Sequence, residues 1–216
     1  MKKTSTDWNN YYNKRSRFSL LAQKVQRKYI LNSIKANINT DKIHSVTELG
    51  GADSCFFEYV MKLFGRIAVF QVVDCSEVGL HKFKQKYGTE FHGVKINAIK
   101  ADVLDKAEIV EEKSDFVYSF GLIEHFDVAG TMKVIQKHFE CASDGGYVLI
   151  TFPTPTLQYR AVRKLMEVMG VWQFWDERPL RYDEFETAVV GVGKIVEKKL
   201  MRKMPLTQMM YLMQKC

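Results

Sequence analysis

The sequence predicts an α/β protein built on a three-layer, doubly wound and mostly parallel sheet. The first observation is the run over residues 67–73, which is nearly all apolar and rich in β-branched residues. That pattern is typical of a parallel strand buried on both faces. The second is the alternation of such runs with helical stretches of about 10–15 residues, which indicates βαβ units. Because parallel crossovers are right-handed, successive units place helices on both faces of one sheet.

The first half of the chain supplies two strands and three helices. Apolar residues recur at helical spacing in the helices, as in the group Phe57, Val60 and Phe64, which precedes a stop at Gly65. The expected elements, in order, are a helix over 18–35, a strand over 43–49, a helix over 56–64, a strand over 67–73 and a helix over 78–87.

The second half continues the alternation and then departs from it. We expect a strand over 98–100, a loop or short helix over 102–112, a strand over 116–120, a helix over 131–139 and a strand over 146–152. Pro153 and Pro155 then break the pattern. Residues 156–182 look like an insertion over the sheet's edge, followed by a helix over 181–190. Two extended segments, 194–204 and 206–214, flank Pro205 and are expected to pair in antiparallel fashion.

Composition limits the class of protein. The chain has 216 residues, which we expect to form a single domain over 1–216, with a helical cover over 1–36 and a lid insertion over 156–182. The net charge of +7 suits an anionic partner but is low for a dedicated nucleic-acid binder. Four scattered cysteines form no CxxC pair, so we expect no metal site and free thiols in the cytoplasm. We also expect no secretory leader and no transmembrane segment.

Polar and small residues follow the expected strands, at the edge where open α/β sheets bind ligands. The segment 48–54 ends the first strand with Gly50 and Gly51, and Asp74 ends the second strand 24 residues after Gly50. An acid at that distance accepts hydrogen bonds from a ribose, although a solvated strand-end acid is the simpler interpretation. Asp102 either accepts from an adenine amino group or caps a helix. Gly121 either permits a turn beside a ligand or belongs to an ordinary connection.

Together these segments resemble the class I S-adenosylmethionine-dependent methyltransferases. ELGGADS at 48–54 resembles the family's E-x-G-x-G-x-G motif, with Ala52 and Ser54 where glycines are usual. VVDCS at 72–76, ADV at 101–103, FVYSFGLIEHF at 116–126 and GGYVLITFP at 145–153 resemble its later motifs in order. The resemblance implies a seven-stranded sheet with an antiparallel last strand, and S-adenosylmethionine as the cofactor. A nicotinamide-binding protein would need G-x-G-x-x-G, which residues 50–55 do not supply.

The resemblance also implies which residues hold the cofactor. These are Glu48, Gly50, Gly51, Ala52, Ser54, Asp74, Cys75, Ser76, Asp102, Val103, Ser119, Phe120 and Gly121.

His125 is the candidate catalytic residue. The sulfonium of the cofactor is an activated donor, so alignment supplies most of the catalysis and a base is needed only for some acceptors. For a hydroxyl acceptor, His125 is the best-placed base, although a lone histidine beside a helix start is more often structural. The neighbouring Glu124 is expected to be exposed.

The acceptor is expected to contact two segments outside the alternating core, residues 1–30 and 156–182. Both combine aromatic rings with guanidinium groups, which suits sugars, nucleotides or anionic groups. The simpler interpretation is that they pack together as a hydrophobic lid. The candidate substrate residues are Trp8, Tyr11, Tyr12, Trp172, Trp175 and Arg178.

The sequence therefore predicts methyl transfer to a small-molecule or glycan-type acceptor. The segment Ser119–Leu122 is not the N/D-P-P-Y motif of DNA amino-methyltransferases, and no Pro-Cys occurs, so no DNA partner is expected. The alternatives are a non-catalytic module of the same fold that binds the cofactor for regulation, and an RNA methyltransferase. The oligomeric state is open, a homodimer included.

Overall fold

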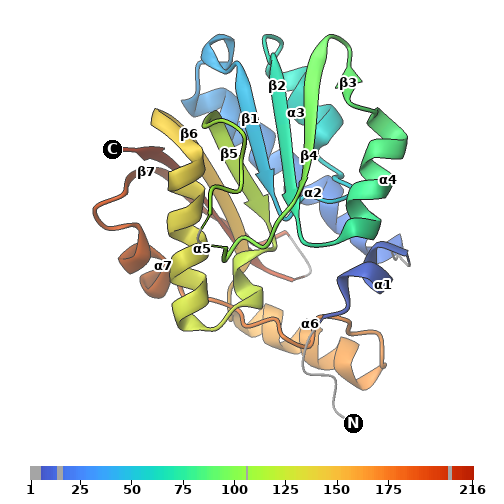
Figure 1. Cartoon of the computed structure of the whole chain (residues 1–216). Helices are drawn as coiled ribbons and strands as arrows, with labels where there is room; N and C mark the ends of the chain where they lie inside the picture. The colour runs from blue at the N-terminus through green and yellow to red at the C-terminus, as the bar shows by residue number, and fades with distance from the viewer. Residues whose placement is uncertain (1–5, 14–16, 106, 204–205) are drawn as a thin grey trace.

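The computed structural model describes residues 6–13, 17–105, 107–203 and 206–216. It contains one eight-stranded sheet in the order β3-β4-β2-β1-β5-β6-β8-β7. The strands are β1 (Ser45–Leu49), β2 (Val69–Asp74), β3 (Glu90–Phe91), β4 (Val94–Lys100), β5 (Ser114–Phe120), β6 (Ala142–Pro153), β7 (Gly193–Met201) and β8 (Gln208–Lys215). The five strands from β4 to β6 are parallel, so the predicted doubly wound sheet is confirmed (Figure 1).

The sheet has one strand more than the seven expected. The extra strand is β3, a two-residue antiparallel edge strand on β4. The C-terminal pair forms as predicted, because β8 runs antiparallel to both β6 and β7. The last strand is therefore antiparallel, and it lies inside the sheet with β7 at the edge. The turn expected at Pro205 falls outside the described residues.

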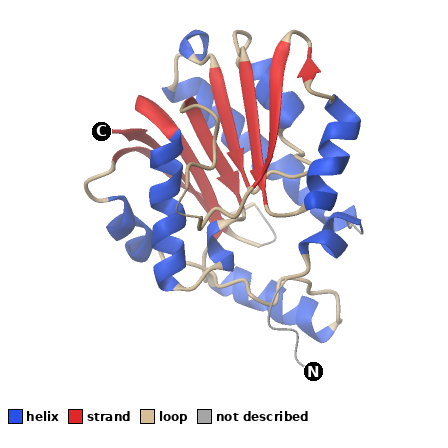
Figure 2. Ribbon diagram, viewed as in Figure 1, coloured by secondary structure: helices blue, strands red, loops and turns tan. Residues whose placement is uncertain are grey.

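The helices form the two outer layers (Figure 2). They are α1 (Trp8–Asn13), α2 (Arg17–Asn37), α3 (Phe57–Leu63), α4 (Glu77–Tyr87), α5 (Val128–Cys141), α6 (Leu157–Val168) and α7 (Tyr182–Val189), with short 3-10 helices η1 (Thr40–Lys42) and η2 (Ile123–His125). Each element expected from periodicity is present within a few residues. The helix α6, inside the segment 156–182, was not predicted; its N-terminus is capped by the hydroxyl of Thr156, which accepts from the Tyr159 N–H at 3.1 Å.

Alternation along the strands sends apolar side chains to two separate cores. On one face, Val46, Phe70 and Val72 pack with α2, α3 and α4. On the other, Val117 and Ile150 belong to the core formed with α5 and α7. Because both faces are covered, the central strands are almost entirely buried, which fits the mainly apolar sequence of β2.

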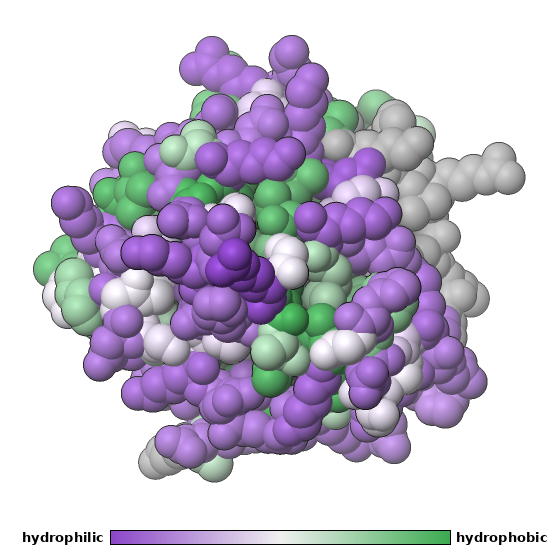
Figure 3. Space-filling view, turned by 90° about the horizontal axis from the view of Figure 1, so that it is seen from above, coloured by the Kyte–Doolittle hydropathy of each residue, from purple (hydrophilic) through white to green (hydrophobic). Residues whose placement is uncertain are grey.

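Hydrophilic residues cover most of one end of the sheet, and two helices lie below the other. Hydrophilic residues cover most of the face seen from above, with smaller hydrophobic areas between them (Figure 3). At the opposite end, where the parallel strands finish, α1 and α6 lie below the sheet (Figure 1). Across the described residues, no helix combines the length and apolar character that a membrane span requires.

Candidate functional site

A cavity of about 900 Å³ opens at the carboxyl ends of the parallel strands. The loops after β1, β2, β4 and β5 form its upper wall, and α1 and the segment after α6 close it from below. Most of the residues predicted to bind cofactor or acceptor line it: Glu48, Gly50, Gly51, Ala52, Ser54, Asp74, Cys75, Asp102, Val103, Phe120, Gly121, His125, Trp8, Tyr11, Tyr12 and Trp172.

The loop after β1 requires small residues. Gly50 has a φ of 69°, a region that side chains disfavour, and its N–H donates to the Val73 carbonyl at 2.8 Å. A Cβ on Gly51 would lie 2.3 Å from the Glu48 side chain. Ala52 takes the place of a glycine because Gly79 of α4 faces it; a Cβ at Gly79 would come within 2.5 Å of the Ala52 Cβ. The space that a glycine at position 52 would leave is therefore provided by Gly79 on the neighbouring helix α4.

Asp74 is buried at the end of β2, where several hydrogen bonds hold its carboxylate. Its carboxylate accepts from the N–H of Ser76 at 2.7 Å, the N–H of Ala52 at 3.1 Å and the hydroxyl of Tyr12 at 3.1 Å. Burial raises the pKa of Asp74, and these hydrogen bonds oppose the rise. Tyr12 was predicted on the acceptor side, but the structure places its hydroxyl against the acid predicted to bind ribose.

The loops after β4 and β5 bring the remaining motif residues to the same cavity. No helix follows Asp102; its Oδ1 instead accepts from the Leu104 N–H at 2.9 Å and stabilises a turn. Gly121 has a φ of 65° and donates its N–H to the Thr151 carbonyl at 3.1 Å. The Phe120 ring packs on Phe56, with ring centroids 3.9 Å apart.

Four predicted residues do not line the cavity. Ser119 is fully buried beneath it, where its hydroxyl contacts His138, and Ser76 caps α4 by accepting from the Gly79 N–H. Trp175 is 44% exposed, although its neighbours Phe174 and Asp176 line the cavity. Arg178 is engaged elsewhere, since its guanidinium donates two hydrogen bonds to Glu184 at 2.8 and 2.9 Å.

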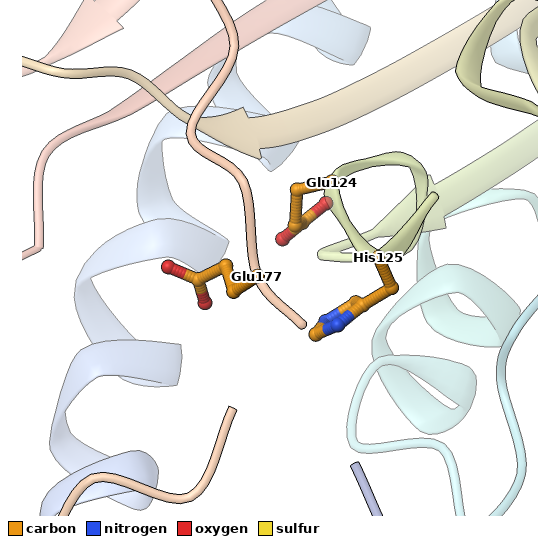
Figure 4. A group of neighbouring side chains, drawn as sticks. All are labelled: Glu124, His125 and Glu177. Atoms are coloured by element: carbon orange, nitrogen blue, oxygen red, sulfur yellow. The ribbon is translucent and has the colours of Figure 1, made fainter. Parts of the chain in front are cut away.

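An acidic cluster surrounds His125 at the lower wall of the cavity. The His125 Nδ1 lies 2.8 Å from Asp176 Oδ1, and the side chains of Glu124 and Glu177 lie close to the ring (Figure 4). Glu124 was expected to be exposed, but it is 2% exposed because η2 turns its side chain inward. Burial raises the pKa values of Glu124 and Glu177. Burial opposes protonation of His125, but its bond to Asp176 and the nearby carboxylates raise its pKa overall.

Aromatic rings from the two segments outside the core pack together, as the sequence predicted. The Trp8 ring lies edge-on to His125, with centroids 4.7 Å apart, and Phe174 contacts both Trp8 and Tyr11. The Trp172 indole is buried and donates to the Phe174 carbonyl at 2.8 Å. The segment after α6 thus presents apolar surface to the cavity.

Asp176 and Glu177 were not predicted as site residues. They lie about fifty positions beyond His125 in the chain and reach it only through the fold, so no local spacing reveals them. The only signal is their position in an acidic pair inside the aromatic segment. Gln26 and Gln208, which also line the cavity, carry no signal at all.

Comparison with known proteins gives the fold. No protein-family model and no curated protein sequence matches the chain. Among solved structures, magnesium protoporphyrin IX methyltransferase (ChlM) from Synechocystis PCC 6803 with bound SAH superposes with a TM-score of 0.67 at 14% identity, over 90% of this chain and 83% of that one. The N-methyltransferase NodS from Bradyrhizobium japonicum WM9 gives 0.62 at 13% identity, over 93% and 89%. The mitomycin 7-O-methyltransferase MmcR gives 0.64 at 9% identity, over 86% and 53%. The chain therefore has the Rossmann-like fold of S-adenosylmethionine-dependent methyltransferases.

Proposed function

We propose that this chain transfers a methyl group from S-adenosylmethionine to a small-molecule or glycan-type acceptor. The observation that carries the proposal is convergence: segments near residues 50, 74, 102 and 121, which resemble separate motifs of one enzyme family, all line one cavity. Its volume of about 900 Å³ lies within the range of cofactor sites. The structural neighbours named as methyltransferases support the same activity.

The residues present fit the cofactor. Gly50 and Gly51 keep the loop after β1 free of side chains that would fill the approach to it, and Asp74 offers a buried carboxylate to the ribose hydroxyls. We assign the adenine to Asp102 and Val103 and the amino-acid end to the region of Glu48 and Gly121. Tyr12 is the Asp74 partner that a ribose hydroxyl would replace.

The acceptor would lie beside His125. When bound, S-adenosylmethionine supplies a methyl group already activated by the sulfonium. The chain's part is to exclude water with the rings of Trp8 and Phe174 and to align the acceptor. Because Asp176 holds the Nδ1 of His125, Nε2 is the nitrogen presented to the acceptor.

Calorimetry with S-adenosylhomocysteine tests the cofactor site. Asp74→Asn should weaken binding by roughly ten- to a hundred-fold, because a hydrogen bond to a charged group contributes about 1.5–3 kcal/mol. Asp144→Asn, on an exposed side chain, is the matched control and should bind as the unaltered protein does. Equal affinities of the two variants would remove Asp74 from the site.

Turnover separates an enzyme from a non-catalytic cofactor-binding module. The protein should methylate at least one member of a panel of hydroxylated and amino small molecules, glycans and RNA, with methyl transfer followed by mass spectrometry. Cofactor binding without transfer to any member would favour the module. We place the reaction in the cytoplasm, because all four cysteines are free thiols, as a reducing compartment requires.

A further inference from the structure

The acidic cluster at the lower wall of the cavity contains three side chains whose donor atoms converge. Glu124 and His125 extend from η2 toward the segment that carries Glu177 (Figure 4). One ligand atom from each, a carboxylate oxygen or an imidazole nitrogen, lies within 4.8 Å of the other two. These residues line the cavity beside the predicted acceptor position, so a ligand held among them would face the acceptor.

Among the described residues, Glu124 has an unpaired carboxylate oxygen that a bound ligand would satisfy. Its Oε2 is buried and, within the described part of the chain, has no hydrogen-bond partner. A buried carboxylate oxygen without a partner is costly to maintain, and native structures rarely keep one without a reason. Glu124 is among the residues that line the cavity, so a positively charged ligand that enters from the cavity and displaces its neighbours slightly would satisfy this oxygen.

The neighbours of the cluster hold its members in fixed orientations. His125 donates its Nδ1–H to Asp176, which is in turn held by the N–H of Thr6 at 2.9 Å and by the Thr6 hydroxyl. The Glu177 Oε1 accepts from the Tyr159 hydroxyl. Imidazoles that bind metal ions almost always donate their other N–H to a carboxylate or carbonyl in this way, and ligating carboxylates are hydrogen-bonded in turn.

The presence of an imidazole favours a metal ion over an ammonium group as the ligand of this cluster. Carboxylates and aromatic rings alone are enough to hold an ammonium group, whereas a histidine fixed through Nδ1 presents Nε2 as a ligand. When a metal is bound, both carboxylates are ionised and the imidazole is neutral, because metal ligands must be deprotonated; their combined charge of −2 then balances a divalent cation. Mixed oxygen and nitrogen donors suit Mn²⁺, Co²⁺ or Zn²⁺ better than Mg²⁺ or Ca²⁺, which prefer oxygen alone.

We propose that Glu124, His125 and Glu177 bind a divalent first-row transition-metal ion, with Asp176 as the residue that positions the imidazole. Three protein ligands leave coordination positions open toward the cavity. An oxygen of the acceptor would occupy one of them, which would orient the acceptor and lower the pKa of its hydroxyl; His125 would then act through the metal, and the proton would pass to water in another open position. This last step rests on the proposed methyl transfer, whereas binding of the metal does not.

Metal binding is measured on the full chain after treatment with a chelator. Mn²⁺ is titrated by electron paramagnetic resonance, in which bound ion no longer contributes to the signal of free ion, and Co²⁺ by its visible absorption. One ion per chain is expected. Glu124→Gln and Glu177→Gln should each weaken binding at least tenfold, and Asp176→Asn should weaken it by about 10–100-fold and change the Co²⁺ spectrum. Glu140→Gln, on the exposed face of α5, is the matched control and should bind normally.

Folding is checked separately, because a variant that unfolds would also lose the ion. Mn²⁺ should raise the melting temperature of the unaltered protein and of Glu140→Gln, but not that of Glu124→Gln. Failure of the unaltered protein to bind either Mn²⁺ or Co²⁺ would overturn the proposal, as would equal affinities in Glu124→Gln and Glu140→Gln. Stabilisation by methylammonium in place of metal would assign the cluster to an amine and also overturn it. S-adenosylhomocysteine binding, measured in chelator, tests the proposed function independently of this result.

Discussion

His138, the buried histidine of α5, should make the stability of the protein depend on pH. Its side chain is fully buried, with Nδ1 2.7 Å from the Val134 carbonyl oxygen and Nε2 2.8 Å from the Ser119 hydroxyl. A carbonyl only accepts, so Nδ1 carries the hydrogen and Nε2 accepts from Ser119. This arrangement requires the neutral ring, and burial lowers the pKa of His138 from 6.5 to about 4.

The magnitude follows from that difference in pKa. Between pH 6.5 and about 4 the unfolded chain binds more protons than the folded protein, so stability decreases as the pH falls through this window. At about 1.4 kcal/mol per pKa unit, the full effect is about 3 kcal/mol, and about 2 kcal/mol of it is reached at pH 5. Above pH 6.5 the contribution of His138 is constant.

Urea unfolding at pH 7.5 and pH 5 measures the effect. The unaltered protein should lose about 2 kcal/mol more than His138→Gln over this interval. His81→Gln, on the exposed side of α4, should behave as the unaltered protein does. Groups such as Glu124, whose raised pKa acts in the opposite direction, are common to all three proteins and cancel in the comparison. The same pH dependence in His138→Gln and His81→Gln would refute this role of His138.

Three further predictions concern the cavity. Gly50→Val should abolish S-adenosylhomocysteine binding in calorimetry, because Gly50 has a φ of 69° and its Cβ would lie 2.9 Å from Leu122; a folded variant that still binds would place the cofactor elsewhere. Tyr12→Phe should tighten cofactor binding by up to about tenfold, since the ribose no longer displaces a hydroxyl from Asp74, and weaker binding would contradict this. Once an acceptor is known, Trp8→Ala should lower kcat/KM at least about tenfold, whereas the exposed Trp175→Ala should change it less than about twofold; equal effects would contradict the assigned positions.

The fold was predictable because its signals are local. Mainly apolar runs such as residues 67–73 reflect burial of a strand on both faces. Each run can be recognised from a few consecutive residues. The two-residue strand β3 carries no such pattern, since it is set by pairing with β4. The helix α6 follows a clear cap at Thr156 and is strongly amphipathic, so the sequence did carry a signal for it, although apolar residues such as Leu157 and Val168 are exposed.

The site was predictable only where residues follow strand ends. Asp74, Asp102 and Gly121 fall there because the carboxyl ends of parallel strands meet at one edge. The partners that decide their chemistry come from elsewhere: Tyr12 reaches Asp74 across 62 positions, and Asp176 reaches His125 across 51. Contacts of that separation depend on how α1 and the segment after α6 pack, which no spacing in the sequence records.

The position of β8 has a consequence for how the protein is made. β8 follows β7 in the chain but inserts between β6 and β7, pairing Gln208 with Pro153 and Gln214 with Tyr147. A nascent chain that has emerged only as far as β7 has an open edge on β6 and no neighbour for β7. Unpaired edges of this kind recruit other chains, so the interval between synthesis of β6 and release of β8 is when the protein is most exposed to aggregation. A ribosome stalled in that interval would present an unfinished sheet to the chaperones of the cell.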